Sequence, residues 1–530
     1  MLHRARPLAV LFLLGLTIHI SAQTLQSVPA RVHYEREMGA DFTTVRLFDN
    51  APATDVPAAR FAQGAQFLHL AESGLAEILA GRPKFIALAL PFHRETLMVD
   101  LVQTDIQTAD FYVATSDAAG EAVAVRPGLH YRGVLRGATG ASLAAFSFFD
   151  NAVMGVVADE QHGNMVLGKV QGNGGQYDYM FYPESELAMD NPFECNLLEE
   201  IPGRATRMQP AADRVETGRA LRVYLEADHQ LYRERGNVQA AADYLSAMFN
   251  IVAALYANEQ IELTLCKIKI WVSPDEYAGL GSSAVLDRFR NQDAGTRADL
   301  SQLIALAGRR QESAAWLDVL CQPEYAVSFS NIYVSYSNVP TWSWTAAVMA
   351  HEMGHNFGIR HTQWCGWPGG AIDPCQLAER GCAAGDFTRV GTTVMSYCPL
   401  ITSGINFSKG FGALPGKTLR GALNAAHCLA PAKTNVKTVE NRNTAVMSLE
   451  SMNLSPNPAT KLVNVQLRYT PQSAVRVVLL DLVGRALHTQ TAVRGDATLQ
   501  FDLSGLQKGV YLVQVFENEQ LVSTKRLIKN

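Results

Sequence analysis

The stretch that most constrains this chain is residues 351–361, which read HEMGHNFGIRH. On a helix, His351 and His355 project from one face about one turn apart, so both imidazoles can reach a single metal ion. Imidazole nitrogen is a common ligand of Zn²⁺. Glu352 follows the first of these histidines and is placed to take a proton from a water held on the ion. The spacing therefore predicts a helix that carries a metal site.

The end of this helix predicts a third ligand. Gly358 can adopt a positive φ and end the helix, after which the chain turns back and His361 can supply another nitrogen. Three protein ligands leave a fourth position for water, the pattern of a catalytic rather than a structural zinc site. Ser343 is the predicted cap at the start of the helix. We expect one catalytic Zn²⁺, and the sequence leaves open whether structural Ca²⁺ is bound.

A methionine lies downstream of the three histidines. Met395 is followed two residues later by Tyr397. An HExxHxxGxxH helix followed by a methionine-containing turn resembles the metzincin class of zinc proteases. The resemblance implies that Met395 packs beneath the zinc ligands. It also makes Tyr397 a candidate for stabilising the oxyanion, with a hydrogen-bonded core tyrosine as the alternative.

Residues 220–429 resemble, within that class, the adamalysin (reprolysin) family and its bacterial relatives. The similarity rests on residues 350–361, on 314–317 and on the cysteines that surround them. Thr362 stands where adamalysins usually carry Asp. Together with Tyr397 this leaves the subfamily open, and a pappalysin-like metzincin with the same chemistry is the competing assignment.

The resemblance implies an α/β metzincin catalytic domain at 216–432, with a mixed twisted sheet and the active-site helix. Hydrophobic patterns predict a helix at 237–258 and strands at 221–225, 263–272 and 328–335. By resemblance, 314–317 is the edge strand that binds substrate, because an extended peptide can add to its unpaired backbone groups. The alternative is an ordinary protected edge.

The N-terminal 22 residues predict export. Arg4 and Arg6 form a basic start, residues 8–20 are apolar, and small residues precede Gln23. This is the pattern of a secretory signal peptide, and the apolar run is short for a membrane anchor. No other stretch of the chain is expected to span a bilayer.

Residues 454–530 predict a small all-β sandwich. They contain no Cys and carry nine Lys and Arg against five Asp and Glu. Turn signals separate expected strands at 462–469, 475–481, 499–503, 510–517 and 521–528. A polar linker at 433–453 precedes them.

This C-terminal segment resembles the sorting domain of type IX secretion, on LSPNPAT at 454–460, DLVGR at 481–485 and GVYLV at 509–513. The resemblance implies a Gram-negative bacterium of the Bacteroidota type. It also implies a route through the periplasm and the outer-membrane type IX machinery, ending in release or attachment at the cell surface. A plain immunoglobulin-like accessory module is the alternative.

Residues 23–215 are expected to form a β-rich pro-domain that blocks the cleft during export. Strands are predicted at 84–90, 110–114, 131–135, 142–149 and 152–157. Residues 131–133 and 142–149 resemble the reprolysin propeptide. An exposed linker where cutting could release the domain is marked by Arg204, Arg207, Arg214 and Arg219.

Eight cysteines in an exported chain predict disulfides. The family resemblance implies a Cys321–Cys428 pair. Two further bridges, with three possible pairings, are expected among Cys365, Cys375, Cys382 and Cys398.

Cys195 and Cys266 are left over. A thiolate is a good zinc ligand, so Cys195, in the predicted pro-domain, could displace the catalytic water and keep the enzyme latent. Its flanking residues do not match the usual cysteine-switch motifs. The alternatives are a disulfide with Cys266 or a free cysteine.

Together these features predict a secreted zinc endopeptidase that acts on proteins or peptides. Zn²⁺ is expected on His351, His355 and His361, with Glu352 as the general base. A net charge of −5 argues against nucleic acid as the main partner, because phosphate binding needs clustered Lys and Arg. The rival from another class is a surface adhesin with a relic metzincin fold, and a second rival is a metallo-hydrolase with non-peptide substrates.

Overall fold

The computed structural model of the chain divides into two compact units, which are described separately. One comprises residues 1–36 and 40–434, and the other comprises 37–39 and 435–530. The structure describes residues 26–51, 62, 64–117, 121–170, 178–187, 194–199, 211–215, 220–292, 298–308, 311–332, 339–373, 375–378, 381–382, 392–397, 404–429, 452–467, 475–481, 486–492, 498–517 and 520–530. The predicted signal peptide and residues 433–451 of the predicted linker lie outside these ranges.

An eight-stranded mixed sheet carries the part of the chain that contains the histidines. Its strands, in spatial order, are β13 (Cys195–Leu198), β17 (Ser313–Trp316), β18 (Val327–Asn331), β16 (Leu300–Ala305), β14 (Ala220–Ala227), β15 (Glu262–Ile270), β6 (Gln107–Thr115) and β7 (Ala122–Val123). The four strands β15, β14, β16 and β18 run parallel, and β17 is antiparallel to β18. The α/β fold and the strands predicted near 221, 263, 314 and 328 are confirmed.

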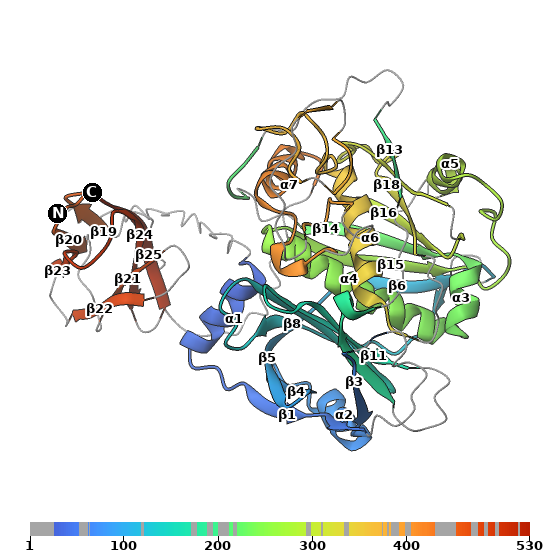
Figure 1. The fold of residues 1–530 in the computed structure, drawn as a ribbon, viewed down its shortest axis with the longest axis horizontal. Helices are drawn as coiled ribbons and strands as arrows, with labels where there is room; N and C mark the ends of the chain where they lie inside the picture. The colour runs from blue at the N-terminus through green and yellow to red at the C-terminus, as the bar shows by residue number, and fades with distance from the viewer. Residues whose placement is uncertain are drawn as a thin grey trace, which may run out of the picture. The chain divides into compact units, whose positions relative to one another are not determined.

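Helices cover both faces of this sheet (Figure 1). The side chains of β14 alternate, so Val223 and Leu225 join the core of α4 (Val238–Asn258) and α6 (Trp342–Asn356). Tyr224 joins the opposite core, beneath α5 (Ser282–Gln292). Two further helices, α3 (His229–Arg235) and α7 (Ala413–Ala425), complete this part of the unit.

Helix α4 confirms the predicted helix at 237–258. Asn237 caps it, since its side chain accepts a hydrogen bond from the Ala240 amide at 2.8 Å. Contrary to expectation, α4 has the length and apolar composition of a membrane span, and it is the only such helix among the described residues. However, 78% of its most apolar window is buried inside the protein, which is what the core helix of a globular domain requires.

A ten-stranded sheet occupies the N-terminal part of the same unit. Its strands, in spatial order, are β1 (Thr43–Arg46), β4 (Phe85–Phe92), β5 (Glu95–Thr104), β8 (Leu129–Leu135), β9 (Ser142–Phe149), β10 (Ala152–Asp159), β11 (Gly163–Lys169), β12 (Tyr179–Pro183), β3 (Gln66–Leu70) and β2 (Phe48–Asn50). The helices α1 (Val28–Glu37) and α2 (Glu72–Gly81) accompany it.

The predicted N-terminal strands all exist, but one of them lies in the other sheet. The strand expected at 110–114 is β6, which pairs with β15 rather than with the ten-stranded sheet. A boundary at residue 215 therefore does not separate the two sheets. The chain before that residue contributes strands to both.

The second unit is the small β-sandwich predicted from the sequence. One sheet contains β19 (Met452–Ser455), β20 (Leu462–Leu467) and β23 (Thr498–Asp502). The other contains β22 (Ala486–Ala492), β21 (Val475–Leu480), β24 (Gly509–Glu517) and β25 (Gln520–Lys529). Inward-facing residues of both sheets, including Val465, Val477 and Val513, form one core. The strands β19 and β22 were not predicted.

The disulfides settle part of the cysteine chemistry. Cys321 is bonded to Cys428, as the family resemblance implied, and Cys365 is bonded to Cys382. Cys375 is also disulfide-bonded, and Cys398 lies outside the described residues. Cys195 and Cys266 are both free cysteines, so the alternative of a bridge between them is wrong.

Candidate metal centre

Helix α6 presents the histidines, and both of its ends differ from an ideal capped helix. It begins at Trp342 after Thr341, so the predicted cap Ser343 lies inside the helix. Thr341 makes no side-chain capping bond. At the other end, Gly358 has φ +91° and its amide donates to the His355 carbonyl at 2.8 Å. The predicted glycine stop is therefore confirmed, and it turns the chain back toward the helix.

The three histidines converge on one point. Ligand atoms of His351, His355 and His361, together with the sulfur of Cys195, all lie within 4.8 Å of one another. The Nε2 atoms of His355 and His361 are 3.2 Å apart. All three imidazoles are buried, with at most 5% of any one residue exposed.

Backbone carbonyls orient the first two rings. Nδ1 of His351 lies 2.9 Å from the Val394 carbonyl, and Nδ1 of His355 lies 2.7 Å from the Ile359 carbonyl. A proton held on Nδ1 leaves Nε2 as an electron-pair donor facing the cluster. Burial, reinforced by the neighbouring histidines, lowers the pKa of both His351 and His355 well below the usual range. Neutral imidazoles with converging Nε2 atoms are a donor set that fits Zn²⁺.

The segment around Met395 forms the floor of this cluster. Met395 is fully buried, and its carbonyl accepts a hydrogen bond from the Thr362 amide at 3.2 Å. A Cβ at Gly354, between the two helical histidines, would lie 2.8 Å from the Met395 sulfur. The helix can therefore approach this methionine closely only because residue 354 has no side chain.

Glu352 is completely buried beside the histidines. Its Oε2 accepts a contact from the Cys195 sulfur at 3.3 Å, and its Oε1 has no hydrogen-bond partner among the described residues. Burial raises the pKa of this carboxyl well above its ordinary value. A buried carboxyl oxygen without a partner fits a site that takes up a further polar group.

Tyr397 lies between the histidines and the N-terminal part of the chain. Its hydroxyl donates to the Cys195 carbonyl at 3.2 Å and lies 3.4 Å from Nε2 of His361. The Cys195 amide in turn donates to the same hydroxyl oxygen at 3.3 Å. The structure thus brings together every residue that the sequence predicted for the site.

Strand β13, which carries Cys195, occupies the edge of the sheet that was expected to receive substrate. It pairs with β17 in parallel, from Cys195 opposite Ser313 to Leu198 opposite Trp316. The Ser313 amide donates to the Glu194 carbonyl at 2.8 Å, which extends the ladder by one bond. In this form of the chain, β17 is covered.

Two contacts beside the histidines were not predicted from the sequence. Arg360 forms a two-pronged ion pair with Glu199, directly after β13. Asn356 donates to the carbonyls of Trp316 and Val327, at 2.9 and 3.2 Å, and so ties α6 to β17 and β18. The only signal for either was the presence of a polar residue within or beside the histidine motif.

Most of the predicted linker arginines lie outside the described residues. Arg204, Arg207 and Arg219 lie outside the described residues. Arg214 is described, and its carbonyl accepts a hydrogen bond from the Asn424 side chain of α7 at 3.0 Å.

Two comparisons with protein families agree with this arrangement. Residues 217–407 match the model of Metallo-peptidase family M12. Residues 453–530 match the model of the secretion system C-terminal sorting domain. The first match implies a zinc-dependent peptidase, and the second implies a secreted or cell-surface location.

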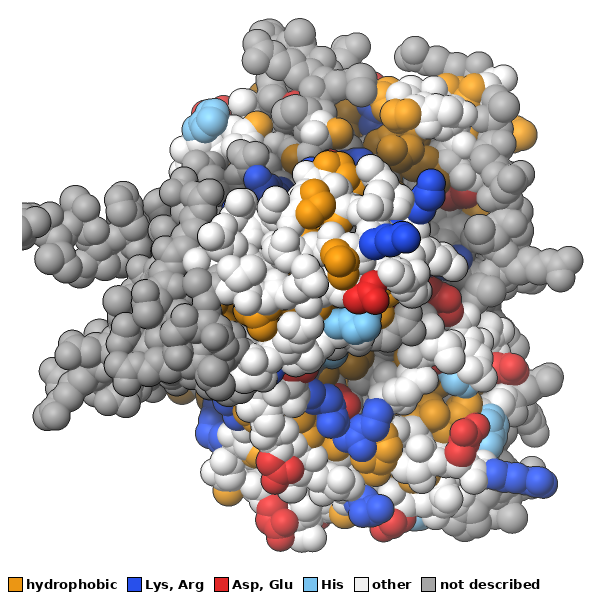
Figure 2. Space-filling view, turned by 90° about the vertical axis from the view of Figure 1, so that its left-hand side faces the viewer, with side chains coloured by type: hydrophobic (Ala, Val, Ile, Leu, Met, Phe, Trp, Pro, Cys, Tyr) orange, Lys and Arg blue, Asp and Glu red, His pale blue; other side chains and the backbone are white. Residues whose placement is uncertain are grey.

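Charged side chains of both signs are interspersed over the described part of the face in Figure 2.

Solved structures give more distant likenesses. Metalloproteinase-II from Bacteroides fragilis is 12% identical, with a TM-score of 0.35, and the match covers 66% of this chain and 96% of that one. OgpA from Akkermansia muciniphila is 13% identical, with a TM-score of 0.23, and the match covers 60% of this chain and 94% of that one.

Proposed function

We propose that the chain is a secreted zinc endopeptidase of the metzincin type. The observation that carries the proposal is the convergence of three buried imidazoles beside one buried carboxyl. His351, His355 and His361 would hold the ion, and three protein ligands would leave one position for water or substrate. Bound zinc would act as a Lewis acid toward the scissile carbonyl and would make water a better nucleophile at neutral pH.

The chain's own groups divide the remaining work. Glu352 takes a proton from the attacking water and passes it to the leaving amine. The Tyr397 hydroxyl, 3.4 Å from Nε2 of His361, donates to the oxygen on which negative charge develops. Met395 supports the histidine helix from below through its contact at Gly354.

Substrate binds along β17. An extended peptide can add to the backbone groups of this strand by the same kind of ladder that β13 makes now. The Asn356 side chain fixes the distance between this strand and the histidine helix, because it bonds to the Trp316 carbonyl. A peptide bond held on β17 would therefore lie beside the three histidines and Glu352.

Glu352→Ala tests the mechanism. The variant should bind one zinc per chain and lose at least about a thousandfold in cleavage of casein or a quenched peptide. Glu276→Ala, which removes an exposed carboxylate paired with Arg288, should cleave normally. Cleavage retained in zinc-loaded Glu352→Ala would contradict the assigned mechanism. If the wild-type chain binds a protein in the presence of a chelator but never cleaves it, the surface adhesin is favoured.

We also propose that residues 23–215 make the precursor latent through Cys195. Its sulfur lies within 4.8 Å of the three histidine ligand atoms, and its strand covers β17. The thiol would hold the position that water needs while β13 excludes the substrate from the sheet edge. Both contacts are made by β13, which has only four residues. One cut followed by detachment of this strand would therefore free the position for water and the sheet edge together.

Cys195→Ala tests this latency in the uncut chain. We expect cleavage of a small peptide to rise at least about tenfold over uncut wild type, since the fourth ligand is lost. Cys266→Ala is the matched control, because Cys266 is also a free cysteine but lies in the core beneath α5. Equal latency in wild type and Cys195→Ala would remove the thiol from the explanation.

The export route completes the proposal. Residues 1–22 serve as the signal peptide, and 454–530 direct the folded enzyme across the outer membrane through the type IX machinery of a Gram-negative bacterium. The match of residues 453–530 to a secretion sorting domain supports this route. Mass spectrometry of the secreted form would give both termini and show which segments remain.

A further inference from the structure

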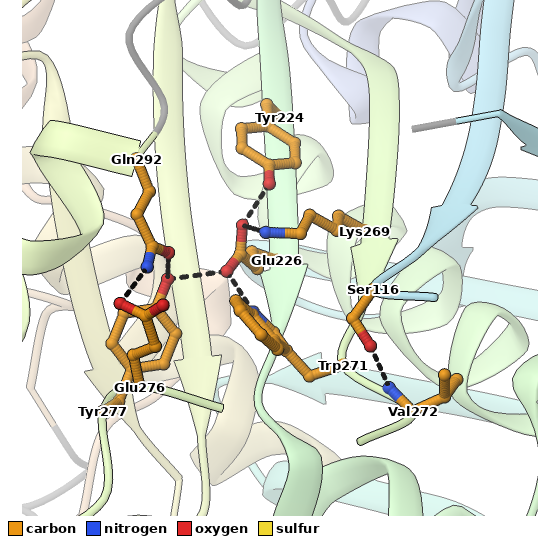
Figure 3. Close-up of polar contacts among 9 residues, drawn as sticks. All are labelled: Ser116, Tyr224, Glu226, Lys269, Trp271, Val272, Glu276, Tyr277 and Gln292. Atoms are coloured by element: carbon orange, nitrogen blue, oxygen red, sulfur yellow. Dashed lines mark hydrogen bonds and ion pairs between the residues drawn. The ribbon is translucent and has the colours of Figure 1, made fainter. Parts of the chain in front are cut away.

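The N-terminal region extends the sheet of the metal centre at its far edge. Strand β6 pairs in parallel with β15, from Tyr112 opposite Lys267 to Thr115 opposite Ile270. The ladder continues past the strand, because the Ser116 amide donates to the Ile270 carbonyl at 3.0 Å. The Val272 amide then donates to the Ser116 hydroxyl at 3.1 Å, as Figure 3 shows. Removal of β6 would leave β15 as a bare edge strand.

Helix α4 is enclosed between the two sheets. Sixteen of its residues are buried, on all sides of the helix. Its apolar residues share one core with Leu143, Ala145 and Phe149 of β9. An isolated catalytic domain would expose this face of α4 to water. The exposed face would be a contiguous apolar surface, which soluble monomers rarely carry.

A buried polar network lies in the middle of this contact. Asn250, on α4, has no exposed surface and donates to the carbonyls of Tyr131 and Phe146, at 3.2 and 3.1 Å. Its Oδ1 accepts from Nε of Arg132 at 3.0 Å. Separating the sheets would break every one of these bonds, and buried groups without partners are costly unless water replaces them.

The start of the histidine helix is also bound to the N-terminal region. The Trp342 indole donates to the Leu167 carbonyl on β11 at 3.0 Å. Gly168, next on that strand, lies so close that a Cβ there would be 2.4 Å from Pro340 and 2.5 Å from the Trp342 nitrogen. Because Thr341 supplies no side-chain cap, these contacts hold the first turn of α6.

The segment that leads to Met395 is held in the same way. Asn164, on β11, donates to the Ile405 carbonyl and accepts from the Phe407 amide, both at 2.8 Å. Between them, the Asn406 amide donates to the Thr392 carbonyl at 2.9 Å. The N-terminal region is thus bonded to both elements that position the zinc ligands.

From these contacts we propose that residues 26–187 stay bound to residues 220–429 after the connecting segment is cut, as a permanent non-covalent part of the enzyme. Only the segment around β13 detaches from the sheet edge, and it remains joined to the N-terminal fragment. This inference rests on the proposed zymogen for its biological setting, and it changes the predicted pro-domain from a disposable inhibitor into a lasting subunit. The partner surface is the far edge of β15, the face of α4 that β9 covers and the start of α6.

The test is a controlled cut in an inactive chain. A recognition sequence for an external site-specific protease is placed within 200–210 of Glu352→Ala, so that the chain cannot cut itself. After complete cutting, native mass spectrometry and size-exclusion chromatography should show one particle with the mass of the uncut chain. The two fragments should separate only in denaturant. Free N-terminal fragment in native buffer would overturn the proposal.

A second variant keeps the experiment decisive. Gly168→Ala should release at least about tenfold more free fragment than the parent after cutting, because its methyl group collides with Pro340 and Trp342. Gly81→Ala is the matched control, since a Cβ there meets open space. Asn164→Ala replaces Gly168→Ala if that chain does not fold. The outcome is independent of peptidase activity, so the failure of either proposal is recognised separately.

Discussion

The two ends of the eight-stranded sheet are both formed by the N-terminal region, β13 at one end and β6 with β7 at the other, yet they differ in length and in packing. Strand β13 has four residues, all partly exposed, and pairs with β17 alone. Strand β6 has nine residues, and it continues into further bonds at Ser116. The N-terminal region behind β6 also packs on α4 and α6. The same kind of strand addition can thus give a contact that is easily lost or one that is hard to lose, depending on what lies behind the strand.

Proline in each strand gives the largest test of this difference. Val113→Pro in β6 should lower the free energy of unfolding by about 3 kcal/mol, since it removes a ladder donor and disturbs a buried side chain. Leu197→Pro in β13 should lower it by about 1 kcal/mol or less and should raise peptide cleavage by the uncut chain. Urea unfolding and a peptide assay measure the two effects. Equal destabilisation by both substitutions would show that the edges are equivalent.

Acid should weaken the N-terminal region through His130, on β8. Burial, aided by the positive charges of Arg132 and Arg82, lowers its pKa from 6.5 to about 3. Below pH 6.5 the unfolded chain takes up a proton on His130 while the folded chain does not. The free energy of unfolding therefore keeps its full value above pH 6.5 and falls as the pH drops toward 3. We expect a loss of about 1.4 kcal/mol per pH unit in that window.

His130→Gln provides the control for that prediction. Gln cannot titrate, and it can still bond to the Ser147 hydroxyl that lies 2.9 Å from Nδ1 of His130. The slope of unfolding free energy against pH should flatten by about one proton between pH 6.5 and 4. An unchanged slope would assign the acid sensitivity to other groups.

The smallest expected effect concerns the ion pair that follows β13. Glu199 is largely exposed, so its pair with Arg360 contributes about 1 kcal/mol or less. Glu199→Ala should raise the basal activity of the uncut chain about two- to fivefold without changing its unfolding midpoint. Glu194→Ala, one residue before β13, is the matched control. Identical activities of the two variants would show that the pair plays no part in holding the strand.

Sequence reasoning succeeded where the determinants are local. The spacing of His351 and His355, the glycine at 358 and the apolar period of 237–258 each describe one turn or one helix, and the structure contains those elements. The β-sandwich of the second unit was equally readable, because alternating strands and turn residues repeat at short intervals.

It failed where two distant segments had to be matched. The strand at 110–114 was predicted, but nothing in its residues specifies β15 as its partner rather than a neighbouring N-terminal strand. Strand β13 has only four residues, too few to show the alternation of a strand. The sequence therefore did not predict that β13 covers β17. Ser343 was read as a cap from its residue type, whereas the first turn of α6 is fixed by the Leu167 carbonyl.

The contact between Gly354 and Met395 limits how far the histidine motif can be transplanted. A designer who grafts HExxH onto another helix copies the ligands. The graft does not copy the close approach of the Met395 thioether to the helix backbone at Gly354. Alanine at 354 is the better helix former, yet here its methyl would push the helix off its support. Any transfer of this site must therefore include Gly354 and Met395 together, because each fits only in the presence of the other.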